Sequence, residues 1–224
     1  MANYEIEIKS LLGGREEADE LIGKMKDADP NFQSLGKHKQ LNHYFVKGDL
    51  QSLKSKLFQH LPEDKQKQFD DLAMQAKDFS VRTRWADGKI IFVIKATVDD
   101  TTSSNGTARR EFESEVDLKL EELDQLLFDS GFEYQAKWSR EREEYQYKNL
   151  SVSVDKNAGY GYLAEFESVI DDQTLADPTK TAIRQMMADL GIKELAQDRL
   201  GRMFDHYNSH WQEYYGTDKI FNIE

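Results

Sequence analysis

The chain has 224 residues and a formal net charge of −12, with 38% hydrophobic and 32% charged residues. This acidic balance excludes nucleic-acid binding as a general activity, because phosphate backbones select basic surfaces. The lack of cysteine excludes disulfides, thiol nucleophiles and zinc-thiolate sites. No apolar run approaches the ~18 residues of a membrane span, and a strand begins too early for a secretory signal. We therefore expect a cytoplasmic protein with no membrane partner.

The first predicted strand, over residues 4–9, has one apolar and one charged face. Alternate side chains of a strand point to opposite faces, so Glu5, Glu7 and Lys9 share the charged one. If this face is solvated, it is only a polar surface. If it is enclosed, its two carboxylates need a cation.

Hydrophobic periodicity predicts the other elements in chain order. Helices are expected over 15–27, 51–61, 63–77, 118–130, 178–190 and 194–215. Further strands are expected over 41–47, 79–85, 90–95, 109–116, 137–147, 150–155 and 162–169, with a loop over 99–107. Asp87-Gly88 predicts a two-residue hairpin turn. The last helix should bury Leu195, Leu200, Met203, Phe204, Tyr207 and Trp211.

Charged side chains recur on one face of most predicted strands, often in same-sign pairs two residues apart. They are Glu5, Glu7, Lys9, Arg82, Arg84, Lys95, Arg109, Glu111, Glu113, Glu115, Arg140, Arg142, Asp155, Glu165 and Glu167. A solvated face gains nothing from same-sign pairing. Eight strands suffice to close a barrel that holds side chains and one small ligand. The pattern favours an α+β fold, an eight-stranded antiparallel β-barrel (tunnel) with helices packed on the outside.

A barrel lined by charge needs compensation, because unpaired buried charge is very costly. Carboxylate pairs indicate Mg²⁺ or Mn²⁺, which prefer hard oxygen ligands. Arginine pairs indicate phosphate, whose oxygens accept bidentate hydrogen bonds. Together they favour a polyphosphate held with a divalent metal.

These motifs resemble the CYTH family, also called triphosphate tunnel metalloenzymes, over roughly residues 3–190. The matching residues, in order, are Glu5, Glu7 and Lys9; Arg82, Arg84 and Lys95; Glu111 and Glu113; Arg140, Arg142 and Tyr145; and Asp155, Gly161, Glu165 and Glu167. The resemblance implies an eight-stranded tunnel that binds a triphosphate with Mg²⁺ or Mn²⁺. Members of the family include class IV adenylyl cyclases, thiamine triphosphatases and inorganic triphosphatases.

The resemblance also implies roles for individual residues. The implied metal ligands are Glu5, Glu7, Glu111, Glu113, Asp155, Glu165 and Glu167, although Glu111 and Glu113 could instead only balance the arginines. The implied triphosphate-binding residues are Lys9, Arg82, Arg84, Lys95, Arg140 and Arg142. The implied catalytic residues are Lys9, Glu165 and Glu167, where Lys9 either aids proton transfer or simply binds phosphate.

The leading interpretation is a metal-dependent triphosphatase acting on inorganic triphosphate, ATP or thiamine triphosphate. The alternatives are a class IV adenylyl cyclase that forms cyclic AMP and pyrophosphate, and a non-catalytic nucleotide- or polyphosphate-binding protein. A charged-exterior sandwich with no site is the remaining alternative. We expect a single domain over 1–224 with a helical insertion at about 51–77 and an extension at about 194–224. Either segment could gate the tunnel, form a homodimer contact or pack on the outside of the barrel.

Overall fold

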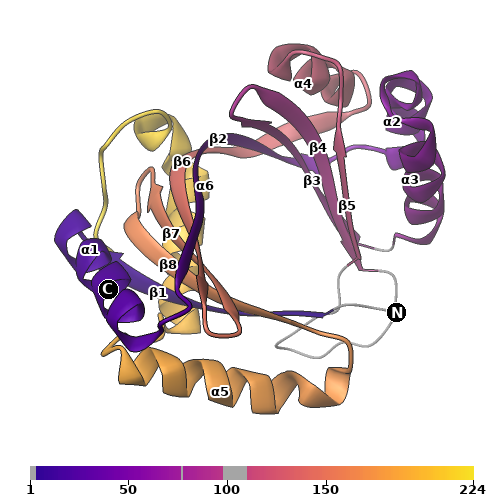
Figure 1. The fold of residues 1–224 in the computed structure, drawn as a ribbon. Coiled ribbons are helices and arrows are strands. Elements are labelled where there is room, and N and C mark those ends of the chain that lie inside the picture. Colours follow the sequence, from indigo (N-terminus) through magenta and orange to yellow (C-terminus); the bar gives the residue numbers. More distant parts are fainter. Residues whose placement is uncertain (1–3, 77, 98–109) are drawn as a thin grey trace. The chain divides into compact units, whose positions relative to one another are not determined.

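A computed structural model describes residues 4–76, 78–97 and 110–224; the expected loop at 99–107 and Arg109 lie outside these residues. The strands are β1 (Tyr4–Gly13), β2 (Gln33–Lys47), β3 (Asp78–Ala86), β4 (Lys89–Thr97), β5 (Arg110–Glu115), β6 (Phe132–Tyr147), β7 (Leu150–Asn157) and β8 (Gly161–Ile170). The helices are α1 (Arg15–Ala28), α2 (Leu50–Leu57), α3 (Glu63–Gln75), α4 (Leu120–Phe128), α5 (Ala176–Asp189) and α6 (Gln197–Tyr214) (Figure 1). Short 3₁₀ turns cover Phe58–His60 and Gln173–Leu175.

The strands form one eight-stranded sheet in the order β1-β8-β7-β6-β2-β3-β4-β5. The predicted α+β class with an eight-stranded antiparallel sheet is therefore confirmed. The order begins at β1 and ends at β5, and no ladder between described residues closes it. The predicted Asp87-Gly88 turn is also confirmed, since both residues have positive φ, 48° and 91°, as a primed hairpin turn requires.

The chain forms two compact units. The first contains the residues up to Lys39 and those from Ser139 on, and the second contains Gln40–Trp138. Strands β2 and β6 each contribute to both units. The expectation of a single domain over 1–224 stays a prediction.

In the first unit, α1 and α5 cover the apolar face of β1 and β8 (Figure 1). The strands contribute buried Ile6, Ile8, Val152 and Phe166, and the helices contribute buried Leu21, Met25, Ile183 and Met187. All of these side chains are at most 4% exposed. The apolar faces of the strands and the apolar sides of the helices therefore pack together in one core. The opposite face of the strands carries the charged residues.

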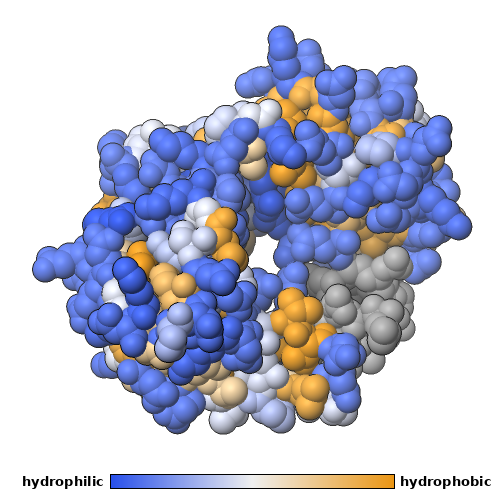
Figure 2. Space-filling view, viewed as in Figure 1, coloured by the Kyte–Doolittle hydropathy of each residue, from blue (hydrophilic) through white to orange (hydrophobic). Residues whose placement is uncertain are grey.

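The second unit repeats this arrangement with α2, α3 and α4. Its core contains Leu53 and Leu57 from α2, Phe69 and Leu72 from α3, and Leu123 and Leu127 from α4, together with Val81, Phe92, Ile94 and Phe112 from the strands. The helical insertion at 51–77 therefore packs its apolar side into the core of this unit. Hydrophilic residues cover most of the molecular face shown in Figure 2.

The C-terminal extension packs against the turn between β7 and β8. Gly159 N–H donates to the Lys219 carbonyl at 3.0 Å, and Phe221 N–H donates to the Gly159 carbonyl at 2.8 Å. The Tyr207 ring of α6 meets the Tyr160 ring edge-on, with centroids 5.9 Å apart. The described residues of this segment therefore pack against this turn, and packing is one of the roles expected for the segment.

Several element bounds and one side-chain placement differ from the sequence-based expectation; β1 extends to Gly13, and β6 begins at Phe132. Strand β2 begins at Gln33 rather than Leu41, because the polar run before Leu41 lacks alternation but pairs across the sheet, as in the Lys37–Glu143 contact at 2.9 Å. The prediction that α6 buries Phe204 is wrong, since its side chain is 41% exposed. The buried pair is Met203 and Tyr207, four residues apart, and Phe204 lies about 100° around the helix from Met203.

No helix formed by the described part of the chain is long and apolar enough to cross a membrane.

A buried carboxylate joins α4 to the sheet of the second unit. The Asp124 side chain accepts hydrogen bonds of 2.6 Å from His43 Nδ1, Thr83 Oγ1 and Tyr134 OH. Asp124 and His43 are 3% and 4% exposed. Burial raises the pKa of Asp124, but the hydrogen bonds from His43, Thr83 and Tyr134 outweigh it, so the pKa lies below its ordinary value. A charged acceptor with three satisfied partners rigidifies this part of the core.

We expect Asp124→Asn to lower the free energy of unfolding by roughly 1.5–3 kcal/mol, because the amide replaces a charged acceptor and turns a donor toward other donors. Urea unfolding at pH 7 measures this change. The control is Glu121→Gln, the same chemical change on an exposed residue of α4, which should stay within about 0.5 kcal/mol of wild type. Equal effects of the two substitutions would contradict a structural role for Asp124.

The difference in free energy of unfolding between wild type and Asp124→Asn should depend on pH. Because the folded-state pKa of Asp124 is lowered, its contribution is complete above the ordinary value of 3.8 and is lost as pH falls below it toward the folded-state pKa. Unfolding curves of wild type and Asp124→Asn should therefore converge below about pH 4. A difference that stays constant down to pH 2 would contradict this explanation.

Candidate functional site

The first unit presents acidic and basic side chains on one face of neighbouring strands. Across the β1–β8 ladder Glu7 lies opposite Glu167, and Lys9 lies opposite Glu165. Residues directly opposite each other in an antiparallel pair point to the same face. On the other side of β8, Ser153 of β7 lies opposite Glu165. The alternation that buries Ile6 and Ile8 therefore gathers these polar groups.

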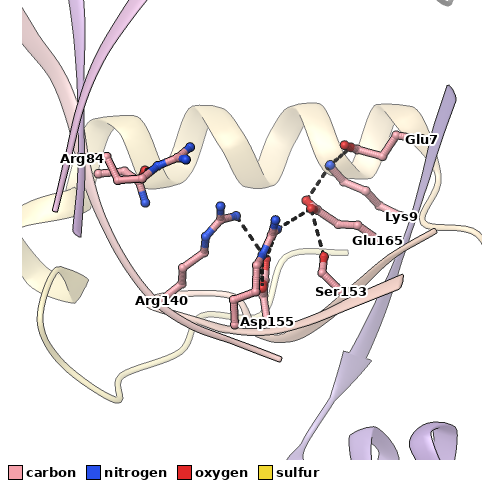
Figure 3. A network of polar contacts seen from close by, with 9 residues as sticks. Glu7, Lys9, Arg84, Arg140, Ser153, Asp155 and Glu165 are labelled. Carbon is pink, nitrogen blue, oxygen red and sulfur yellow. Dashed lines mark hydrogen bonds and ion pairs between the residues drawn. The ribbon is translucent and has the colours of Figure 1, made fainter. Parts of the chain in front are cut away.

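Lys9 bridges two carboxylates on this face. Its Nζ donates to Glu165 Oε1 at 2.8 Å and also contacts Glu7 Oε1 (Figure 3). The Lys9 and Glu165 side chains are 26% and 18% exposed, so solvent screens this pair only in part. The ammonium group thus neutralises part of the charge of Glu7 on β1 and of Glu165 on β8.

The two arginines of β6 share one buried carboxylate. Arg142 Nε donates to Asp155 Oδ1 at 2.7 Å and Arg142 Nη2 to Asp155 Oδ2 at 2.6 Å, which is a bidentate contact. Arg140 Nη1 donates to the same Oδ2 at 3.1 Å (Figure 3). The Asp155 side chain is 0% exposed. Both of its oxygens are therefore engaged by guanidinium groups.

Glu165 connects these two clusters. Arg142 Nη2 donates to Glu165 Oε2 at 2.6 Å, and Ser153 Oγ donates to the same oxygen at 3.3 Å. Burial raises the pKa of Glu165, but the charges of Lys9, Arg142 and Arg140 outweigh it and lower the pKa to about 2. Burial lowers the pKa of Arg142, but its contacts with Asp155 and Glu165 raise it overall. Glu165 and Arg142 are therefore ionised at neutral pH.

The second unit carries its own pair of arginines on β3. Arg82 lies opposite Tyr44, and Arg84 lies opposite Asn42. Arg84 Nε donates to Asn42 Oδ1 at 2.8 Å, and the Arg82 guanidinium lies 4.9 Å from the centre of the Tyr44 ring. Arg82 Nε is buried and has no hydrogen-bond partner among the described residues. A buried donor in this state is costly unless a ligand satisfies it.

Strands β4 and β5 add the remaining predicted residues. Lys95 lies opposite Glu111, with Nζ 3.1 Å from Oε2. Glu113 Oε2 lies 3.6 Å from Arg84 Nη1, beyond direct hydrogen-bond distance. Both glutamates thus lie next to cations of the same unit.

The donor chemistry of the first unit fits a divalent cation. Glu5 and Glu7 on β1 and Glu165 and Glu167 on β8 supply the carboxylate oxygens that Mg²⁺ and Mn²⁺ prefer. Glu7 and Glu167 lie directly opposite each other, and such a like-charged pair is stabilised by a cation. Within the described residues no three Asp, Glu or His side chains already converge as ligands. The oxygens of Asp155 bind Arg140 and Arg142, and those of Glu165 bind Lys9 and Arg142, so either carboxylate would exchange one of these contacts to hold a metal.

Within each unit several of the predicted site residues contact one another. Glu7, Lys9, Arg140, Arg142, Asp155 and Glu165 form one network in the first unit, and Arg84 with Glu113 and Lys95 with Glu111 form pairs in the second. Sequence reasoning missed the contributions of Asn42 and Tyr44. The alternation of β2, which buries His43 and Phe45, could have placed both on the face of the arginines.

The family model that matches this chain describes the CYTH domain and covers residues 3–199. No curated protein matches the chain. Among solved structures, the PH1012 protein of Pyrococcus horikoshii aligns with a TM-score of 0.58 and 19% identity, covering 84% of this chain and 91% of that one. The PH1819 protein of the same organism aligns with a TM-score of 0.57 and 19% identity, over 87% and 94% of the two chains.

A Vibrio parahaemolyticus protein, provisionally described as an adenylate cyclase, aligns with a TM-score of 0.60 and 14% identity. The alignment covers 92% of this chain and 99% of that chain. At these levels of identity the three structures show a shared fold.

We expect Lys9→Met to raise the pKa of Glu165, because the substitution removes a positive charge 2.8 Å from its carboxylate. An NMR titration of glutamate side-chain carboxyl ¹³C resonances measures this directly. Lys24→Met, which removes an exposed lysine on α1 of the same unit, is the control and should leave that titration unchanged. An unshifted Glu165 in Lys9→Met would show that the arginines alone hold its charge.

Proposed function

Because the chain belongs to the CYTH family, whose members act on triphosphate-containing substrates, we propose that it is a divalent-metal-dependent triphosphatase. The substrate class is inorganic or organic triphosphate. The observation that carries this proposal is the side-by-side arrangement, on one face of the first unit, of a carboxylate group on β1 and β8 and an arginine pair on β6. A polyphosphate with its divalent counter-ion requires both.

The arginines are assigned to the phosphate oxygens. Arg140 and Arg142 are already held in fixed orientations by Asp155, so little side-chain freedom is lost when they bind an anion. Arg82, whose buried Nε has no partner within the described residues, offers an additional donor in the second unit. Guanidinium groups bind phosphate in a bidentate way and neutralise the charge that develops during phosphoryl transfer.

Glu5, Glu7, Glu165 and Glu167 are assigned to the divalent metal, which supplies Lewis-acid polarisation of phosphate oxygens and activation of water. Glu165 remains ionised because its pKa is about 2, so it is a ligand rather than a proton donor at neutral pH. Lys9, which contacts Glu7 and Glu165, is placed to hold a proton at Nζ beside these groups. Lys9 is therefore assigned to phosphate binding or proton transfer.

A second candidate is cyclisation of ATP to cyclic AMP and pyrophosphate. The fold shared with the Vibrio parahaemolyticus protein described as an adenylate cyclase favours this candidate. The same arginines and carboxylates would serve, since both reactions require a bound triphosphate and a divalent cation. A non-catalytic polyphosphate-binding protein is the third candidate, but anion binding alone requires the arginines and not the carboxylates on β1 and β8.

We expect Glu165→Gln to lower the metal-dependent turnover by about 10²–10³-fold, because the change removes a charge that organises Lys9, Arg142 and the metal ligands. The control is Glu141→Gln, an exposed carboxylate of β6 in the same unit, which should keep wild-type turnover. Full activity of Glu165→Gln would overturn the metal assignment.

The deciding assay incubates the protein with inorganic triphosphate, ATP and thiamine triphosphate, with Mg²⁺ and then with Mn²⁺, and separates every product. Orthophosphate with the matching diphosphate product supports the triphosphatase. Cyclic AMP with pyrophosphate identifies a cyclase and overturns the leading proposal. Tight binding without any product supports the binding protein.

A further inference from the structure

The two arginine pairs of this protein are held by different kinds of partner. Arg142 of the first unit is held by the carboxylate of Asp155. Arg84 of the second unit donates its Nε to a neutral amide oxygen, that of Asn42, at 2.8 Å, and the Glu113 carboxylate lies 3.6 Å from its Nη1. Asn42 is only 2% exposed and lies directly opposite Arg84 across the β2–β3 ladder.

A neutral acceptor and a carboxylate orient a guanidinium equally well. They differ in how they change the local positive potential around it. Both fix the plane of the group by accepting from Nε. A carboxylate also places a negative charge beside the guanidinium, and this charge competes with any incoming anion. An amide leaves the net positive charge in place.

The neighbouring pair on the same two strands also places an uncharged residue opposite an arginine. Arg82 lies opposite Tyr44 and stacks near its ring, with the guanidinium carbon 4.9 Å from the ring centre. An aromatic ring also restrains a guanidinium without adding a formal charge. β2 thus presents neutral groups opposite both arginines of β3.

We propose that Asn42 is a positioning residue that orients Arg84 for a phosphate oxygen, and that its neutrality preserves the anion affinity of the β3 arginines. This inference rests on the proposed function, since it assumes a polyphosphate ligand. Asn42 acts through Arg84 and does not itself contact the ligand. Glu113, whose Oε2 lies 3.6 Å from Arg84 Nη1, offsets the charge of Arg84 less than the direct contacts with Asp155 and Glu165 offset that of Arg142.

Two substitutions separate orientation from charge. Asn42→Ala removes the acceptor, and Asn42→Asp keeps an acceptor at the same place but adds a negative charge. We expect Asn42→Ala to weaken the binding of inorganic tripolyphosphate by about 3–10-fold, the value of one hydrogen bond. We expect Asn42→Asp to weaken it by at least about 10-fold, because the added charge lies beside the guanidinium.

Isothermal titration calorimetry of each full-length variant with inorganic tripolyphosphate in EDTA makes the measurement independent of metal and turnover. The matched control is Gln68→Glu, which adds the same charge on the exposed side of α3 and should bind as wild type. Arg84→Ala is the reference for complete loss of this contact. Thermal unfolding of each variant verifies that it is folded. In steady-state kinetics Asn42→Asp should raise KM by a larger factor than it lowers kcat.

The outcomes separate this inference from the proposed function. If wild type binds tripolyphosphate, Arg84→Ala binds weakly, and both Asn42 variants bind within twofold of wild type, only the role of Asn42 is overturned. Weakening by Asn42→Ala without further weakening by Asn42→Asp overturns the argument from neutrality. If wild type does not bind tripolyphosphate in EDTA, this inference fails. The proposed function fails only if the product assay with Mg²⁺ and Mn²⁺ also shows no turnover.

Discussion

The two-residue period of the strands is the constraint on which the rest of this structure depends. Each unit buries one face of its strands under helices, so that Ile6 and Ile8 in the first unit and Phe92 and Ile94 in the second are almost inaccessible. The side chains between the buried ones then share the opposite face. Because those positions are occupied by same-sign pairs, the charges on that face need partners of opposite sign.

The compensation differs between the units. In the first, one continuous chain of contacts runs from Glu7 through Lys9, Glu165 and Arg142 to Asp155. In the second, an amide and an aromatic ring take the positions opposite the arginines, while Lys95 pairs with Glu111. In the first face most cations therefore contact carboxylates directly, whereas in the second the arginines are oriented mainly by uncharged groups.

Much of this organisation could be predicted from the sequence because alternation is a local signal. The faces of β1, the Asp87-Gly88 turn and the eight-strand count all follow from neighbours within a few residues. The start of β2 could not be predicted, since its polar residues are held by cross-strand partners such as Glu143, more than 100 positions away. The role of Asn42 required the β2–β3 register, which brings it opposite Arg84. The orientation of Phe204 depends on which side of α6 packs against the turn between β7 and β8.

The division of the chain between the units also bears on the order of folding. The second unit consists of one continuous segment, Gln40–Trp138, whereas the first joins both ends of the chain. In the first, Tyr4 pairs with Ile170, and Lys9 pairs with Glu165. Such distant pairings carry a high loop-closure entropy and form slowly compared with hairpins such as β3–β4. We therefore expect the continuous unit to fold while the chain is still being synthesised, and the charged network around Lys9 to assemble after β8 has been made.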